Sequence, residues 1–203
     1  MAGATTLLCN PETKNAFDHM ISTGVAKPFI LVAPTYYYDA RHLLYDWEQF
    51  PREMREEIMP LVESTYRTYA ETADEVGFRA SRDHRAICGF SMGSMTTWAL
   101  FPHMLDVSAS FLPFSGPMQD TEAMIAAVEK NEEPFYIYMA CGGAEDLAFE
   151  NCNALAQTLA ADPHFSYGPS REENNFFYCL SDNIHQDLTS RYYLYNAFLD
   201  GLF

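Results

Sequence analysis

The pentapeptide GFSMG at positions 89–93 is the pattern with the clearest chemical meaning in this sequence. It follows a short apolar run, 85–90, and precedes a segment of helical character, 92–100. Small residues around a serine allow a tight turn between a strand and a helix, and such a turn exposes the serine hydroxyl beside the helix N-terminus. The motif alone is a weak signal, but its position between a strand and a helix makes Ser91 a candidate nucleophile.

A serine hydroxyl is a poor nucleophile until a base takes its proton, so a histidine is required. Where the nucleophile sits on this kind of turn, the partners follow it in the order acid, then histidine. His185 meets this condition because it comes after the last apolar run, 175–180. The other histidines come before the serine, directly after the elbow helix or before the last strand: His19, His42, His84, His103 and His164.

The acid is expected just after the preceding apolar run, 135–141. A glycine pair there leads into Glu145 and Asp146, and position alone does not choose between them. Asp182, three residues before His185, is a third candidate, although an aspartate so placed more commonly orders its own loop.

Five apolar runs alternate with amphipathic segments, which predicts an α/β fold with a mainly parallel sheet and helices on both faces. The predicted strands are 29–34, 85–90, 108–114, 135–141 and 175–180, and the predicted helices are 51–69, 92–100, 121–131, 147–160 and 188–199. Pro60 should kink the first helix because proline lacks the amide donor. Its expected apolar face comprises Phe50, Met54, Ile58, Leu61 and Val62, and that of the last helix Leu188, Tyr192, Tyr195 and Leu199. Without repeats or linkers, residues 1–203 are expected to form one domain.

The composition excludes several classes of function. Twelve basic against 28 acidic residues give a net charge of −16, which argues against nucleic-acid and anionic-membrane partners. No apolar run approaches the ~20 residues that span a bilayer, and residues 1–14 do not read as a signal peptide. The five cysteines form no CxxC pair and are expected to be reduced. The pairs Asp83–His84 and His185–Asp187 each combine a histidine with an aspartate, but they lack the third and fourth ligands that a metal site needs.

The segment HRAICGFSMGSMTTW at 84–98 resembles the elbow region of the feruloyl esterases attached to bacterial xylanases, which are esterase D-like α/β-hydrolases. Four further stretches resemble the same family: 15–34, 112–116, 142–148 and 163–167. The resemblance implies an α/β-hydrolase fold, no cofactor, Ser91 as nucleophile, His185 as base and Asp146 as acid. It also implies hydrolysis of hydroxycinnamic esters on arabinoxylan.

The sequence departs from that family at its N-terminal side. Such enzymes begin with further strands, the third of which ends in a His-Gly-Gly loop that donates a second oxyanion-hole N–H. This sequence lacks that motif, so the expected fold is N-terminally shortened, with the Met92 N–H as one donor. One strand position in the sheet, between the predicted strands 29–34 and 85–90, therefore has no obvious occupant. Residues 4–9 would fill it, another chain of an oligomer would complete the sheet, or the protein is a compromised fragment.

Three hypotheses of function follow. The first is a serine carboxylesterase that acts on feruloyl esters. The second is an esterase for other acyl groups, such as acetyl-xylan or a siderophore ester, and the third is a non-catalytic relative that binds a ligand or partner. Tyr36 or Tyr37, with Met118 opposite, is predicted to line the acyl slot, because tyrosine offers a flat face and a hydroxyl. A cell-wall substrate implies export, and the compartment stays open.

Overall fold

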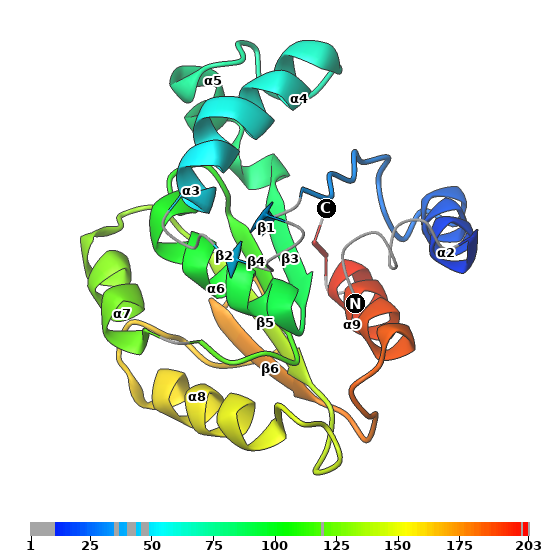
Figure 1. Cartoon of the computed structure of the whole chain (residues 1–203), viewed down its shortest axis with the longest axis vertical. Helices are drawn as coiled ribbons and strands as arrows, with labels where there is room; N and C mark the ends of the chain where they lie inside the picture. The colour runs from blue at the N-terminus through cyan, green and yellow to red at the C-terminus, as the bar shows by residue number, and fades with distance from the viewer. Residues whose placement is uncertain are drawn as a thin grey trace.

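A computed structural model of the chain describes residues 11–34, 37–39, 44–45, 49–118, 120–199 and 201–202. Its centre is a parallel sheet in the order β3-β4-β5-β6, which is also the order along the chain (Figure 1). The strands are β3 (Ala86–Phe90), β4 (Ser110–Phe114), β5 (Tyr136–Cys141) and β6 (Phe176–Leu180). Each lies within a predicted strand, and the predicted α/β fold class is confirmed.

Helices connect successive strands, as parallel pairing requires. They are α6 (Met92–Met104), α7 (Thr121–Lys130) and α8 (Phe149–Ala161), with α9 (Asp187–Leu199) after the last strand. These four helices agree with four of the five predicted ones to within a few residues. The largest difference is that α6 continues through Pro102 to Met104.

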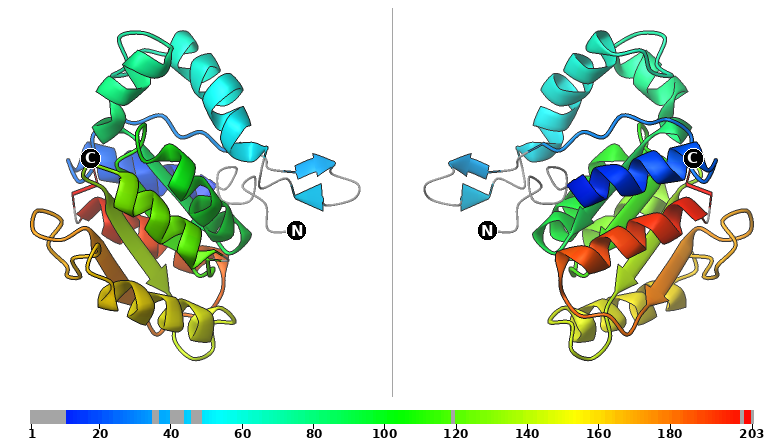
Figure 2. Two further views of the ribbon diagram at one scale, coloured as in Figure 1. Left: turned by 90° about the vertical axis from the view of Figure 1, so that its left-hand side faces the viewer. Right: turned by 90° about the vertical axis from the view of Figure 1, so that its right-hand side faces the viewer.

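Two apolar clusters fill the space on either face of the sheet. Phe111 and Ile137 point to the face covered by α6, α7 and α8, whereas Leu112 and Tyr138 point to α9 and α2 (Pro11–Ser22). Figure 2 shows these two helical layers from opposite sides. Alternate residues of a strand point to opposite faces, so the apolar β4 and β5 are buried on both.

The predicted helix over 51–69 consists of three consecutive segments. They are α3 (Phe50–Glu53), a π-helical turn η1 (Met54–Ile58) and α4 (Met59–Thr65). The irregularity expected at Pro60 takes the form of this wider turn, which directly precedes the proline. The extra residue of a π turn rotates the face that follows it, which explains why Leu61 is exposed rather than buried as predicted. The helix ends at Thr65, earlier than predicted, because Tyr66 is extended.

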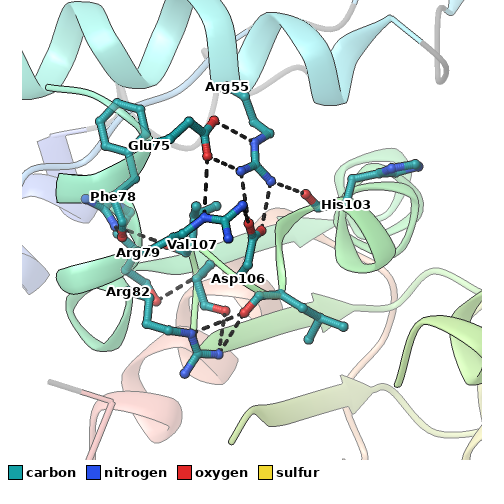
Figure 3. A network of polar contacts seen from close by, with 11 residues as sticks. Arg55, Glu75, Phe78, Arg79, Arg82, His103, Asp106 and Val107 are labelled. Carbon is teal, nitrogen blue, oxygen red and sulfur yellow. Dashed lines mark hydrogen bonds and ion pairs between the residues drawn. The ribbon is translucent and has the colours of Figure 1, made fainter. Parts of the chain in front are cut away.

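Ion pairs join this helical arm to the body of the molecule. Arg55 of η1 binds both carboxylate oxygens of Asp106, at 2.8 and 3.0 Å, and its Nη1 also donates to the His103 carbonyl. Glu75 binds Arg55 from α5 (Glu75–Ala80), which the sequence did not predict. Figure 3 shows this network. A 3-10 turn, η2 (Arg82–His84), then leads into β3.

The predicted strand at 29–34 is wrong. Residues 27–34 belong to no strand of the described chain, and Ile30, Leu31 and Val32 are 42–46% exposed. Within the described residues, β3 is therefore an edge strand. An apolar sequence does not make a strand without a neighbour to bond its backbone. Two further short strands, β1 (Tyr37–Asp39) and β2 (Leu44–Tyr45), pair with each other and with no other described strand. Residues 4–9 lie outside the described chain.

The apolar face predicted for the last helix is also wrong. Of its four residues, Leu188, Tyr192 and Leu199 are exposed, and Tyr195 is partly buried against the core. The buried face of α9 instead comprises Thr189, Ser190, Tyr193, Leu194, Ala197 and Phe198. The alanine and the two small hydroxyl residues on this face allow α9 to pack closely against the sheet.

None of the described helices combines the length and hydropathy needed to cross a membrane. The described residues also form no cluster of three or more His, Cys, Asp or Glu side chains that could hold a metal ion. Four cysteines fall within the described chain, and all are free thiols: Cys88, Cys141, Cys152 and Cys179.

Candidate active site

Ser91 occupies a strained turn between β3 and α6. Its backbone angles are φ 57° and ψ −116°, a left-handed conformation that is unusual for a residue with a side chain. Its N–H donates to the Phe114 carbonyl of β4 at 2.8 Å. Gly89 makes the turn possible, because a Cβ there would lie 2.0 Å from the Gly93 carbonyl oxygen. The structure thus contains the strand–turn–helix element that the motif predicted.

His185 links Ser91 to Asp146. Its Nε2 lies 2.9 Å from Ser91 Oγ, and its Nδ1 lies 2.9 Å from Asp146 Oδ1. The imidazole also packs against the Phe90 ring, with 4.7 Å between centroids. Both ring nitrogens are therefore engaged, and the ring plane is fixed by an apolar neighbour.

Asp146 is the acid that the structure brings to His185, whereas Glu145 and Asp182 are exposed. Its buried carboxylate accepts hydrogen bonds from the Ala148 N–H at Oδ1 and the Gly142 N–H at Oδ2. Burial alone would raise the pKa of Asp146, but its interactions with the Ala148 N–H, the Ser115 side chain and His185 outweigh it and hold the pKa below its usual value. Asp146 is therefore a carboxylate at neutral pH.

The loops that carry the acid and the base are bonded to each other. Gly143 N–H donates to the Asn183 carbonyl at 3.1 Å, and a Cβ on Gly142 would lie 2.2 Å from the same oxygen. Ser181 hydrogen-bonds Tyr193 of α9 at 2.9 Å and also accepts from the Asn183 N–H. The separation between Asp146 and His185 is thus set by contacts beyond their own.

A third loop, 115–118, reaches the same edge of the sheet from β4. A Cβ on Gly116 would lie 2.4 Å from the Ser91 carbonyl oxygen, so this loop touches the elbow. The Gly116 carbonyl accepts from Ser94 Oγ at 2.8 Å and Trp98 Nε1 at 3.2 Å. Met118, two residues further on, is half-buried and lines a hollow of about 370 Å³ between α7 and α8.

The remaining predicted residues can be placed only in part. Met92 is the first residue of α6, so its N–H stands at the helix N-terminus next to Ser91. Tyr36 lies outside the described residues, and only the backbone of Tyr37, in β1, is described. Ser115, a buried residue with φ 49° that follows β4, belongs to no motif that would single it out from the sequence.

Three of the other histidines have partners away from the site. The His164 Nδ1 lies 2.8 Å from Asp162 Oδ1, His84 stacks on Tyr69, and the carbonyl of His103 accepts from Arg55. Their exclusion as the base agrees with these contacts.

Comparisons with known proteins identify the family. The chain is 31% identical to a solved mutant of the feruloyl esterase module from Clostridium thermocellum complexed with sinapinate, with a TM-score of 0.82. That match covers 91% of this chain and 67% of the solved one. The chain belongs to the feruloyl esterase family.

Two further comparisons also cover most of this chain. The chain is 32% identical over 196 residues to endo-1,4-beta-xylanase Y of Acetivibrio thermocellus, a match that covers 92% of this chain but only 18% of the xylanase. A ferulic acid esterase structure has a TM-score of 0.66 at 17% identity, with coverage of 95% of this chain and 77% of its own. At that identity the similarity concerns the fold. No protein-family model matches the chain.

Proposed function

We propose that this chain is a serine carboxylesterase that hydrolyses hydroxycinnamoyl (feruloyl) esters of plant cell-wall polysaccharide through an acyl-enzyme. The observation that carries the proposal is the hydrogen-bonded series of Ser91, His185 and Asp146, with 2.9 Å at each step. This series supports acyl transfer because the serine has a base and the base has an orienting carboxylate. The acyl group is inferred from the solved relative, which carries sinapinate, a hydroxycinnamate.

In the acylation step, Ser91 Oγ attacks the ester carbonyl while His185 Nε2 takes the hydroxyl proton. Asp146 accepts the Nδ1 proton in a hydrogen bond, which selects the tautomer with a free Nε2 lone pair and stabilises the imidazolium. The tetrahedral intermediate then collapses, the bond between the carbonyl carbon and the sugar oxygen breaks, and His185 gives its proton to that oxygen. Ser91 is left as a hydroxycinnamoyl ester.

Deacylation repeats these steps with water as the nucleophile. His185 takes a proton from water, the resulting hydroxide attacks the acyl carbon, and the Ser91 oxygen leaves with the proton from His185. The negative oxygen of both intermediates is assigned to the Met92 N–H, because the N-terminus of α6 carries a partial positive charge. A second oxyanion donor is not assigned to a residue.

The acyl slot is proposed to include Met118 together with Tyr36 or Tyr37. Support comes from loop 115–118, which carries Met118 and touches the elbow at Gly116. A planar phenolic acid suits an apolar slot with flat walls. Replacing Met118, Tyr36 or Tyr37 by alanine should lower kcat/KM more for methyl ferulate than for an acetate ester. Equal losses on both esters would contradict the slot.

The decisive experiment compares wild type with Ser91→Ala on methyl ferulate and on p-nitrophenyl acetate. We expect the wild type to prefer the ferulate, and the variant to lose at least about 10³-fold in kcat with an unchanged melting temperature. A fluorophosphonate probe should label wild type and leave the variant unlabelled. Faster acetate turnover would favour an esterase for other acyl groups, and a folded wild type that neither turns over nor labels would favour a non-catalytic relative.

A further inference from the structure

Ser115 follows β4, the strand between the nucleophile and the acid. In the sheet, Phe114 is level with Phe90 of β3 and Ala140 of β5. The residues that come next, Ser91, Ser115 and Cys141, therefore lie at the same level, which for Ser91 and Ser115 is just beyond the ends of β3 and β4. Ser115 N–H donates to the Ala140 carbonyl at 2.8 Å, which anchors Ser115 next to the segment that delivers Asp146.

The conformation and burial of Ser115 call for an explanation. It is 1% exposed and has φ 49°, and Ser91 is the one other residue besides glycine with positive φ in the described chain. Its hydroxyl makes no hydrogen bond of standard geometry with the described residues. A strained backbone and a buried hydroxyl both reduce stability, so their combination beside a catalytic series points to a role in function.

The neighbouring carboxylate oxygen can accept this hydroxyl. Asp146 Oδ1 already has two donors, Ala148 N–H and His185, both at 2.9 Å. Oδ2 has one donor in the described structure, Gly142 N–H at a longer 3.2 Å. A carboxylate oxygen has room for two donors. The Ser115 side chain is also near enough to Asp146 to contribute to its lowered pKa.

We propose that Ser115 is a positioning residue whose hydroxyl donates to the Asp146 carboxylate and thereby holds the Asp146–His185 pair in the orientation that activates Ser91. This inference rests on the proposed function. With the Ser115 hydroxyl on Oδ2, the carboxylate cannot rotate about its Cβ–Cγ bond, so Oδ1 stays directed at His185 Nδ1. Ser115 acts through Asp146 and does not touch the reacting atoms.

Other titratable groups lie around this hydroxyl. Burial raises the pKa of Tyr193 to about 12, and burial also raises that of Tyr178. The thiols of Cys141 and Cys152 hydrogen-bond to each other. This hydrogen bond is the chief reason why the pKa of Cys141 is lowered and the pKa of Cys152 is raised. Among the described residues, the titratable groups that interact with Ser115 or with one another here are Asp146, Cys141, Cys152, Tyr178, Tyr193 and His185.

The test uses three variants in the full chain. Ser115→Ala removes the hydroxyl and keeps the strained backbone, whereas Ser115→Gly removes the hydroxyl and relieves the strain. Ser108→Ala, the matched control, removes another buried serine hydroxyl, which donates to the Arg85 carbonyl before β4 begins. We expect both Ser115 variants to lose about tenfold in kcat on methyl ferulate with KM unchanged, the scale of one hydrogen bond to a charged group. The control should keep its kcat.

Two further readouts separate positioning from a structural role. Without the Ser115 hydroxyl the Asp146 carboxylate can rotate, so its hydrogen bond to His185 weakens and the imidazolium is less stabilised. The acid limb of the kcat/KM profile should therefore move to lower pH, and the proton NMR signal of the His185 Nδ1–H should move upfield in both variants. A Ser115→Gly enzyme with wild-type kcat, or an acid limb and proton signal that stay in place, would overturn the inference. If wild type itself lacks activity, the proposed function fails, whereas the NMR signal still tests Ser115.

Discussion

Two segments of this chain have similar apolar sequences and opposite surroundings. Tyr136–Cys141 forms β5, in which every residue is buried. Residues 29–34, FILVAP, are equally apolar, yet Ile30, Leu31 and Val32 stand more than two-fifths exposed. β5 has a strand on each side and a helical layer on each face, whereas 29–34 pairs with no described strand. An apolar run therefore indicates a need for burial, and the neighbouring elements decide whether that need is met.

The same contrast separates the candidate site from the outer segment. Ser91, Asp146 and His185 follow β3, β5 and β6, and their side chains are fixed by hydrogen bonds to one another and by the half-buried Phe90 ring. The predictions below test whether activity and stability reside in this inner part of the molecule.

The largest effect is expected at the acid. Asp146→Asn should lower kcat by about 10⁴-fold, because an amide favours the wrong tautomer of His185 and cannot stabilise the imidazolium. Steady-state kinetics on a ferulate ester measures this loss. Glu145→Gln, one residue away and exposed, is the control and should keep full activity. Comparable losses of kcat in Asp146→Asn and Glu145→Gln would contradict the assignment of Asp146 rather than Glu145 as the acid.

A matched pair of truncations tests the contrast in burial. Ile137→Ala in β5 should lower the free energy of unfolding by about 2–5 kcal/mol, since it leaves a cavity in a fully buried strand. Leu31→Ala should cost less than about 1 kcal/mol because its side chain is largely in water. Urea unfolding at neutral pH gives both values. If Leu31→Ala proves as costly as Ile137→Ala, residues 29–34 are buried in solution.

The ion-pair network of the helical arm should have an intermediate effect. Arg55→Met removes bonds to Asp106, Glu75 and the His103 carbonyl, and should cost about 1–2 kcal/mol of unfolding free energy. Arg52→Met, one turn earlier, breaks a 3.9 Å pair with Glu56 between exposed side chains. It should cost about 0.3 kcal/mol of unfolding free energy. Equal changes in melting temperature would show that the network does not hold the arm.

Acid should weaken the fold by a small amount through two aspartates. Burial opposes the ionisation of both Asp106 and Asp146. The hydrogen bond from Arg55 nevertheless leaves the pKa of Asp106 below its usual value. Interactions with Ala148, Ser115 and His185 do the same for the pKa of Asp146. A lowered folded-state pKa gives stability above the unfolded pKa of about 3.9 that is lost as the pH falls through the folded value. Unfolding free energy should therefore decline below about pH 4. Asp106→Asn should flatten this decline, and an unchanged slope would contradict it.

Much of the inner structure could be predicted from the sequence. The strands β3 to β6 were recognisable because each is a short apolar run between turns, and the elbow because glycine, serine and glycine stand between a strand and a helix. The order serine, acid, histidine along the chain led to His185, and in the structure His185 lies 2.9 Å from both Ser91 Oγ and Asp146 Oδ1. Position in the turn did not choose between Glu145 and Asp146, and the family resemblance implied Asp146. The fold gives the physical reason, since Glu145 is exposed and Asp146 is buried against His185.

The failures have physical causes in packing. The buried face of α9 includes Thr189 and Ser190, so a pattern based on apolar side chains selected the wrong face. The π turn before Pro60 changed the phase of the helix, and no sequence period reveals an inserted residue. Ser115 was passed over because its strain and burial depend on contacts between strands. The roles of Ser91, Met92, Asp146 and His185 and the acyl slot stay predictions.

The exposed segment at Ile30, Leu31 and Val32 bears on how copies of the chain meet in solution. A net charge of −16 makes copies repel one another, and that repulsion reaches about 10 Å at 0.1 M salt but only about 3 Å at 1 M. Contact between apolar side chains is not screened in this way. Concentrated salt should therefore promote self-association through this segment, visible as increased light scattering, and a Leu31→Lys substitution should suppress it.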